Sequence, residues 1–163
     1  MDRYDPPYTI TDSMLERVAS ISEKLGRIST ARGLENKPQL RRNNRIKSIH
    51  SSLRIEANSL SLGQVRDVIG GKMVIGAQRE IQEVKNAYEA YERLPEIDPY
   101  SIDDLKTLHG IMTKCVVEES GFFRTGEEGV FNGDRCVFVA PPAKLVNELM
   151  ENLFDWMNRA RGS

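Results

Sequence analysis

The sequence has 163 residues, of which 39% are hydrophobic and 29% are charged, and its formal net charge is -1. A chain of this size and composition is predicted to fold as one soluble globular domain with a core, which excludes an intrinsically disordered protein. The nearly balanced charge provides no overall field for nucleic acid or an anionic membrane, and no segment approaches the ~20 apolar residues that span a bilayer.

The first predicted element is an amphipathic helix over residues 11–28. Its apolar residues recur every three or four positions, at Met14, Val18, Ile21, Leu25 and Ile28. A second helix follows the breakers Gly33 and Pro38, and its apolar positions are Ile46, Ile49, Leu53, Ala57 and Leu60. Ile55 points away from this stripe, so we expect the second helix to be packed on two sides.

Three more helices are predicted from capping patterns and periodicity. Ser61 and Gln64 form a capping-box pattern that opens a short helix up to Ile69. Residues 77–94 form a helix whose apolar face contains Ile81, Val84, Tyr88, Tyr91 and Leu94. Ser101, with Asp104 three residues later, caps a further helix that extends through residue 116.

The composition changes at Gly121, where a glycine-rich segment begins. β-forming residues flank Asn132 and Gly133, a dipeptide typical of tight hairpin turns, so a two-stranded hairpin is predicted. A last helix follows from residue 143, with a broad apolar face that contains Leu145, Leu149, Leu153, Phe154, Trp156 and Met157. The predicted fold class is therefore mainly α, with one small β-hairpin.

One carboxylate lies among the apolar positions of the second helix. Ser52 and Glu56 are four residues apart and so share one side of this helix. A carboxylate that is even half buried is costly unless a cation or several donors meet it. Glu56 therefore needs a partner, and two remain open: a cation in the same or a neighbouring helix, or a functional arginine elsewhere.

The histidines and cysteines do not form a recognisable catalytic or metal site. His50 and His109 are the only histidines, and neither has a nucleophile or a metal-ligand companion nearby in sequence. His109 is expected to be a core or boundary residue of its helix. Cys115 and Cys136 lack metal-site spacing and are expected to be reduced thiols in a cytoplasmic protein.

Several segments, in this order, resemble the N-terminal half of Fic-family proteins. They are PPYTIT, SSLRIEANSLSLGQV, QREIQEVKNAYEAYE, DPYSIDDLKTLHGIM and the long segment from Gly121 to Asn158. The resemblance implies a helical Fic-like domain with a flap hairpin. The family's usual chemistry is AMPylation, the transfer of AMP from ATP to a hydroxyl side chain of a target protein.

The resemblance also implies roles for individual residues. The stretch from Ser52 to Ala57 is similar to the inhibitory-helix motif: serine or threonine, three residues, glutamate, then glycine or asparagine. Glu56 would be the regulatory carboxylate, paired with an arginine that otherwise holds the ATP γ-phosphate. Ala57 departs from the common glycine, and we expect the helix to persist there because alanine is the better helix former.

The segment RTGEEGVF resembles the Fic flap, which binds nucleotide and target. Glu128, Gly129, Val130 and Phe131 would lie along the edge of the nucleotide and present backbone groups to a target protein. The residues themselves leave two options for the exposed hairpin edge. It could receive a strand from another protein, or the hairpin could have a structural role only.

The family's catalytic signature, a histidine followed by phenylalanine, an acidic residue and Gly-Asn-Gly-Arg, does not occur in the 163 residues. In the complete enzyme that histidine would be the general base, the glycines and amides would hold phosphates, and the acidic residue would hold Mg. We therefore expect a truncated chain without catalytic or metal residues. It should bind neither ATP nor Mg tightly and should be inactive alone in AMP transfer.

The expected organisation is an N-terminal helical region with the inhibitory helix, residues 1–60, followed by the first part of a Fic core with its flap, residues 61–163. Expected partners are a target protein at the flap edge and the remainder of a Fic core or a Fic enzyme. No membrane partner is expected. The basic residues between Arg41 and Lys47 and the wide apolar face of the last helix leave self-association open.

Two alternative functions remain. The first is a stand-alone, antitoxin-like module that inhibits a Fic enzyme in trans through Glu56. The second is a small nucleic-acid-binding helical protein that uses the basic run Arg41, Arg42, Arg45 and Lys47. That run has no interleaved aromatic residues for base stacking, so a solvated helix face is preferred over nucleic-acid contact.

Overall fold

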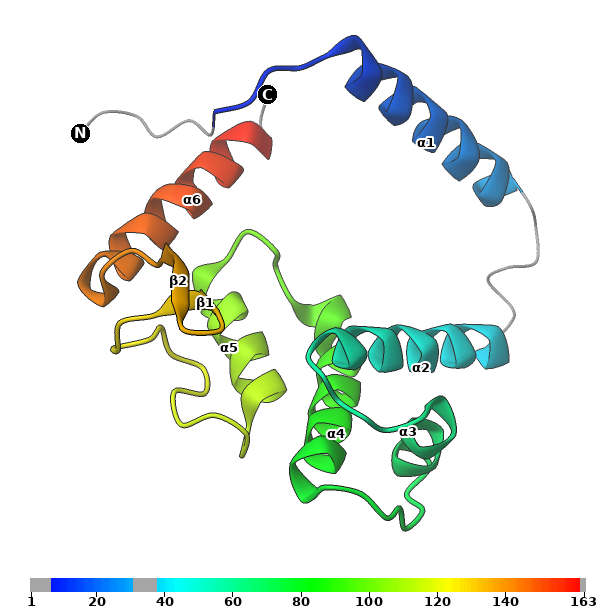
Figure 1. Ribbon diagram of the computed structural model, residues 1–163. Coiled ribbons are helices and arrows are strands. Elements are labelled where there is room, and N and C mark those ends of the chain that lie inside the picture. The colour runs from blue at the N-terminus through cyan, green and yellow to red at the C-terminus, as the bar shows by residue number, and fades with distance from the viewer. Residues whose placement is uncertain (1–6, 31–37, 162–163) are drawn as a thin grey trace. The chain divides into compact units, whose positions relative to one another are not determined.

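The computed structural model describes residues 7–30 and 38–161, and Figure 1 shows its elements in chain order. The chain divides into two units, one up to Arg45 and one from Ile46, so the boundary lies inside helix α2 (Pro38–Ile55). The division into residues 1–60 and 61–163 stays a prediction. Pro6, the first residue of PPYTIT, and the predicted breaker Gly33 lie outside the described residues.

Helix α1 (Asp12–Thr30) confirms the first predicted helix to within two residues. Its start is supported by Thr11, whose Oγ1 accepts a hydrogen bond from the Met14 backbone N–H at 3.3 Å. The predicted stripe Met14, Val18, Ile21, Leu25 and Ile28 is exposed within this unit. The amphipathic pattern is therefore real, but the first unit by itself does not bury it.

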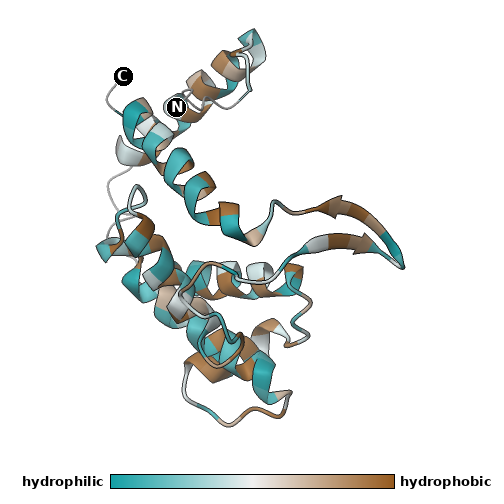
Figure 2. Cartoon of the chain, turned by 90° about the vertical axis from the view of Figure 1, so that its left-hand side faces the viewer, coloured by the Kyte–Doolittle hydropathy of each residue, from teal (hydrophilic) through white to brown (hydrophobic). Residues whose placement is uncertain are grey.

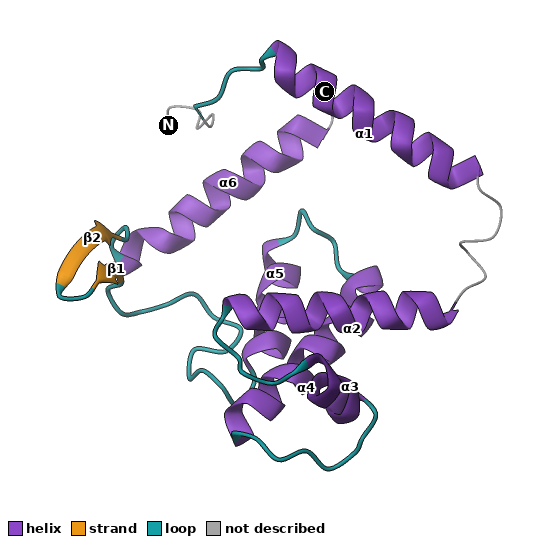
Figure 3. Cartoon of the chain, turned by 45° about the vertical axis from the view of Figure 1, so that its right-hand side comes forward, coloured by secondary structure: helices purple, strands orange, loops and turns teal. Residues whose placement is uncertain are grey.

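The core of the second unit is made by the end of α2, by α3 (Leu62–Ile69) and by α4 (Gln78–Arg93). Figure 3 shows these helices beside one another. The buried cluster contains Ile46, Ile49, Leu53, Leu60, Val65, Val68, Val84 and Ala87. Because α2 ends at Ile55, Ala57 and Leu60 lie beyond the helix, although Leu60 is still buried. The expectation that α2 packs on two sides is wrong, since Ile55 is 83% exposed.

Both predicted helix caps are present. The Ser61 hydroxyl accepts from the Gln64 backbone N–H at 3.3 Å, and the Gln64 side chain accepts in return from the Ser61 N–H at 3.0 Å. Ser101 Oγ accepts from the Asp104 N–H at 3.2 Å, directly before α5 (Ile102–Thr113). Helix α5 is shorter than predicted, because the backbone leaves the helical conformation at Lys114, with a ψ of 125°, and Cys115 is then left-handed with a φ of 59°.

Asn86 on α4 connects that helix to the end of α5. Its side chain is buried, and its Nδ2 donates to the carbonyls of Met112 at 3.1 Å and Lys114 at 2.8 Å. Its Oδ1 accepts from Gln82 Nε2 at 2.8 Å. Carbonyls in the last turn of a helix lack intrahelical partners, so Asn86 supplies donors that water cannot supply at a buried position.

The predicted hairpin consists of β1 (Gly129–Asn132) and β2 (Arg135–Val139), paired antiparallel. Its two loop residues are Gly133 and Asp134, one position later than the Asn-Gly signal suggests, and Gly133 has the positive φ of 59° that tight hairpin turns require. The register shifts after Val130, which marks a bulge. Figure 2 shows both strands as largely hydrophobic and extending away from the helices.

The described part of the chain has two 3-10 turns at helix ends, the second of them after the hairpin. A 3-10 turn, Leu94–Glu96, follows α4, and a second one, Ala143–Leu145, leads into α6 (Val146–Arg161). Of the broad apolar face predicted for α6, Phe154 is buried and Leu149 is exposed. The predicted fold class is confirmed: the described residues form helices and one two-stranded hairpin. Within them, no helix has the length and apolar character needed to cross a bilayer.

Candidate functional site

Glu56 directly follows the last residue of α2, where the chain turns in a Schellman motif. The Ala57 N–H donates to the Arg54 carbonyl at 3.2 Å, and the Asn58 N–H donates to the Leu53 carbonyl at 3.0 Å. This pair of bonds closes a helix when the residue after the cap is left-handed, and Ala57 has a φ of 64°. The prediction that alanine would continue the helix is wrong, and Glu56 is exposed rather than half buried.

Ala57 occupies a backbone conformation that glycine adopts without strain. We expect Ala57→Gly to raise the free energy of unfolding by about 0.5–1 kcal/mol, since left-handed alanine costs roughly 1–2 kcal/mol and glycine's freedom in the unfolded chain offsets about 0.4–1 kcal/mol. Urea denaturation measures the change. Ala87→Gly, inside α4, is the control and should destabilise by about 1 kcal/mol or more. A less stable Ala57→Gly protein would contradict the assignment.

The two residues after this turn are bonded to the first turns of α4. Asn58 is buried, and its Nδ2 donates to the Glu80 carbonyl at 3.1 Å and to Glu83 Oε2 at 2.9 Å. The Ser59 N–H donates to Glu80 Oε1 at 2.6 Å, and the Ser59 hydroxyl donates to Glu80 Oε2 at 3.0 Å. Bonds to charged acceptors are the stronger class, so the backbone just after Glu56 is held firmly against α4.

Glu56 lies at the edge of a hollow of about 530 Å³ between the end of α2, α4 and α5. The hollow is lined by Leu53, Glu56, Arg79, Glu83, Leu105, Leu108, His109, Met112, Thr113 and Val116. Among residues 7–30 and 38–161, the Glu56 carboxylate has no hydrogen bond or ion pair. Arg79 Nε instead pairs with Glu83 Oε1 at 3.2 Å. An unpaired carboxylate beside apolar walls can accept two parallel bonds from a guanidinium.

Ser52, the other predicted regulatory residue, is exposed in the last turns of α2. No other part of the described chain hydrogen-bonds its hydroxyl. The structure therefore places Ser52 one helical turn before Glu56, as the four-residue spacing predicts, without connecting the two side chains. Its regulatory role stays a prediction.

The predicted flap residues Glu128, Gly129, Val130 and Phe131 lie at the start of the hairpin, with Glu128 just before β1. The Glu128 carbonyl accepts from the Ala140 N–H at 2.9 Å, which closes the base of the hairpin. Val130 and Phe131 are exposed. The hairpin is thus a free-standing pair of strands whose edge backbone groups are available to an extended segment, the geometry that strand addition needs.

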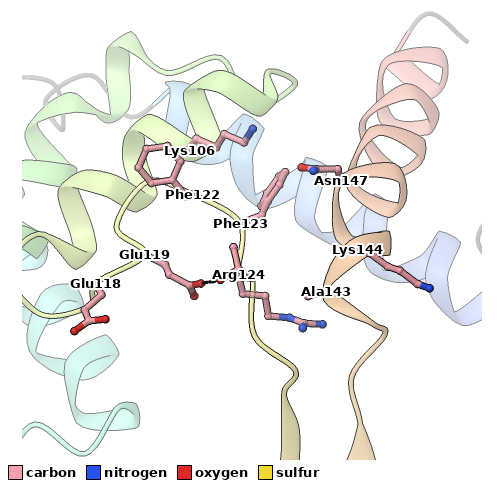
Figure 4. A pocket seen from close by; sticks show the side chains of 10 residues that line it. Lys106, Glu118, Glu119, Phe122, Phe123, Arg124, Ala143, Lys144 and Asn147 are labelled. Carbon is pink, nitrogen blue, oxygen red and sulfur yellow. Dashed lines mark hydrogen bonds between the residues drawn. The ribbon is translucent and has the colours of Figure 1, made fainter.

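Arg124 holds the base of the hairpin together. Its Nη1 donates to the Gly126 carbonyl at 2.6 Å, and its Nη2 donates to the Pro141 carbonyl on the returning limb. The guanidinium lies in a hollow of about 710 Å³ that also includes Lys106 and Phe123 (Figure 4), and Lys106 Nζ lies 4.5 Å from the centre of the Phe123 ring. The Arg124 guanidinium is therefore bonded within the chain. It links the segment that enters the hairpin to the segment that leaves it.

Glu119, on the same loop, accepts from the Thr125 N–H at 2.8 Å and from the Thr125 hydroxyl at 2.7 Å. These bonds favour the ionised form and hold the pKa of Glu119 below its usual value. Their stabilising contribution is therefore present above the unfolded pKa, about 4.3, and is lost as the pH falls through the lower folded pKa.

We expect Thr125 to lose its anchor in that acidic range. An amide NMR titration should show the Thr125 resonance move with the ionisation of Glu119, and Glu119→Gln should abolish the movement. Glu118→Gln, which changes the neighbouring carboxylate, should leave it intact. A Thr125 resonance that is independent of pH in the unmodified protein would refute the contact.

The histidines and cysteines singled out in the sequence do not form a catalytic or metal site among the described residues. His109 is exposed rather than a core residue, and its Nδ1 accepts from the Gly121 N–H at 3.1 Å, which secures the loop before the flap. His50 Nε2 is buried without a partner among the described residues. Cys115 and Cys136 are free and exposed. Within the described ranges, no three His, Cys, Asp or Glu side chains converge in a way that could hold a metal ion.

Sequence reasoning missed the residues that position Glu56. Asn58 appeared only as part of a resemblance, and Glu80 and Glu83 were not singled out, although they bond to the turn that follows Glu56. Glu80 and Glu83 lie 21 or more residues from their partners along the chain, so no local pattern contains the contact. The only signal was a polar Asn-Ser pair between buried Leu53 and Leu60.

The chain is similar in structure and sequence to a known protein. The crystal structure of a Fic family protein from Desulfovibrio desulfuricans G20 is similar to this chain with a TM-score of 0.87 and 46% sequence identity, over 95% of this chain and 48% of that one. The chain has a Fic-like fold. No protein-family model matches it, and no curated protein matches it. The chain spans about half the length of the Fic family protein to which it is similar.

The Fic-like fold agrees with the resemblance seen in the sequence. The aligned span includes nearly all of the chain, so it includes most of the elements that carry Glu56 and the hairpin. A structural match at this level of identity supports a function related to the Fic family in general terms.

Proposed function

We propose that this chain is the regulatory and flap half of a Fic-type protein adenylyltransferase, which transfers AMP from ATP to a hydroxyl group of a target protein and releases pyrophosphate. One observation carries the proposal: the exposed Glu56, whose carboxylate is unpaired among the described residues, lines the edge of an apolar-walled hollow in a Fic-like fold. Its regulatory function would be to pair with an arginine from outside the described residues, because Arg79, which lines the same hollow, is paired with Glu83.

The inhibitory effect of Glu56 follows from its charge. A carboxylate bonded to a phosphate-binding guanidinium removes a cation from the ATP γ-phosphate and places a repelling anion in its path. ATP then binds only in an unproductive position. The Schellman turn and the Asn58 contacts support this role, because they fix the backbone on the C-terminal side of Glu56.

The hairpin would supply the target site. Its exposed edge can pair with an extended segment of the target, so that main-chain bonds align a target hydroxyl with the nucleotide whatever the neighbouring side chains are. Exposed Val130 and Phe131 would add apolar contact. Arg124 supports this role because it fixes both limbs at the base of the hairpin.

The proposal assigns no general base and no metal ligand to this chain. The described residues do not bring together a set of side chains that fits Mg. ATP, Mg and the target hydroxyl would meet residues of a catalytic segment that the 163 residues do not contain. No step proposed for this chain depends on a metal.

Labelled ATP distinguishes this proposal from other phosphate chemistry. Full-length protein is incubated in parallel with ATP labelled at the α-phosphate and with ATP labelled at the γ-phosphate. AMP transfer leaves only the α label on protein, whereas phosphoryl transfer leaves only the γ label. Protein-bound γ label, or no protein-bound label even after replacement of Glu56, would rule out the proposed function.

A further inference from the structure

Arg79 and Glu56 line the same hollow without pairing. Arg79 is the one lysine or arginine among the described residues that line this hollow. Its side chain is 70% exposed and so is free to change rotamer, whereas Glu83, its partner at 3.2 Å, is 19% exposed. The structure thus contains a cation that could neutralise Glu56, already engaged by a different carboxylate.

Glu83 uses its two oxygens for two different contacts. Oε1 accepts from Arg79 Nε, and Oε2 accepts from Asn58 Nδ2 at 2.9 Å. The first contact occupies Arg79, and the second fixes the turn just after Glu56. The half-buried Glu83 carboxylate therefore contacts both Arg79 and the turn that follows Glu56.

The Arg79–Glu83 pair is weakly held. An arginine that precedes its acidic partner by four residues is the less favourable order on a helix. Arg79 is also the second residue of α4, where the helix dipole disfavours a cation. If Glu83 lost its charge, Arg79 would be drawn to the remaining free carboxylate of the hollow, which is Glu56.

We propose that Glu83 is a positioning residue for Glu56: it holds Arg79 away, so that the Glu56 carboxylate stays free for an arginine from outside this chain. The inference rests on the proposed function. Neutralising Glu83 creates an internal Arg79–Glu56 pair, which competes with the external arginine. Inhibition by Glu56 is then weakened although Glu56 itself is unchanged.

The decisive variant is Glu83→Gln, because the glutamine side-chain oxygen can still accept from Asn58 while the charge is removed. In full-length protein we expect about a two- to five-fold rise in AMP transfer, the effect of one exposed ion pair. Adding Arg79→Gln should return transfer to the unmodified level. Glu96→Gln, which removes the same charge from the Arg93–Glu96 pair at the other end of α4, should have no effect.

A crystal structure of the Glu83→Gln variant of this chain gives a readout that does not require activity. The Arg79 guanidinium should lie within hydrogen-bond distance of the Glu56 carboxylate. If Glu56→Gly raises transfer but Glu83→Gln does not, and Arg79 stays apart from Glu56, the role of Glu83 is wrong while the proposed function stands. If the double variant remains activated, Glu83 does not act through Arg79. If Glu56→Gly also has no effect, regulation by Glu56 fails, and the role of Glu83 fails with it.

Discussion

Glu56→Gly in the full-length protein is expected to raise AMP transfer onto the protein itself by about ten- to a hundred-fold. Hydrogen bonds to a charged group contribute roughly 1.5–3 kcal/mol, and each 1.4 kcal/mol corresponds to about a factor of ten. Without the carboxylate, this energy no longer favours the inhibited position of the arginine, which then binds the γ-phosphate. Intact-mass spectrometry after incubation with ATP counts the AMP adducts.

Two further variants separate charge from folding. Glu56→Gln keeps the shape of the side chain and removes its charge, so it should reproduce most of the increase. Glu96→Gly removes an exposed glutamate outside the hollow and should leave transfer unchanged. Unchanged or reduced modification of a Glu56→Gly protein with an intact circular dichroism spectrum would show that Glu56 is not inhibitory.

Much of the fold is readable from local patterns. The apolar spacing of α1, the capping box at Ser61 and the cap at Ser101 all depend on residues within one or two turns of each other, and the structure contains them. The hairpin is also local, since its turn needs a glycine with positive φ at one position, Gly133. Patterns of this kind are visible without tertiary information.

The predictions that were wrong at the candidate site, those for Ala57 and Glu56, have a common physical origin. Helix propensity favours alanine at position 57, yet Ala57 adopts the left-handed conformation because the contacts of Asn58 and Ser59 with α4 require the chain to turn there. These contacts outweigh a strain of roughly 1–2 kcal/mol. Local propensity is a weak predictor where several bonds to charged groups act on the neighbouring residues.

The position of Glu56 depends on the same tertiary contacts. The apolar stripe of α2 suggested a half-buried carboxylate on a continuous helix, whereas the turn places Glu56 at the exposed helix end beside a hollow formed by α4 and α5. That hollow includes the last turn of α5. The geometry around Glu56 therefore depends on the residues that hold the end of α5, and Asn86 is a buried one that bonds to the Met112 and Lys114 carbonyls there.

Asn86→Ala is expected to cost about 3 kcal/mol of folding stability and to lower the Tm by about 6–12 °C. The change leaves the Met112 and Lys114 carbonyls and the Gln82 amide without their partner, in an environment where Asn86 is only 1% exposed. Each buried polar group left unpaired costs roughly 1–3 kcal/mol, and partial access of water limits the sum. Urea and thermal denaturation measure the loss.

Asn158→Ala is the matched control. Asn158 also donates from Nδ2 to two carbonyls, those of Tyr100 at 3.1 Å and Phe154 at 2.9 Å, but it is exposed, so water can replace it and the cost should stay below about 1 kcal/mol. Because Met112 and Thr113 line the hollow beside Glu56, Asn86→Ala should also disturb that wall. Equal losses in the two variants would mean that Asn86 does not hold α5 in place.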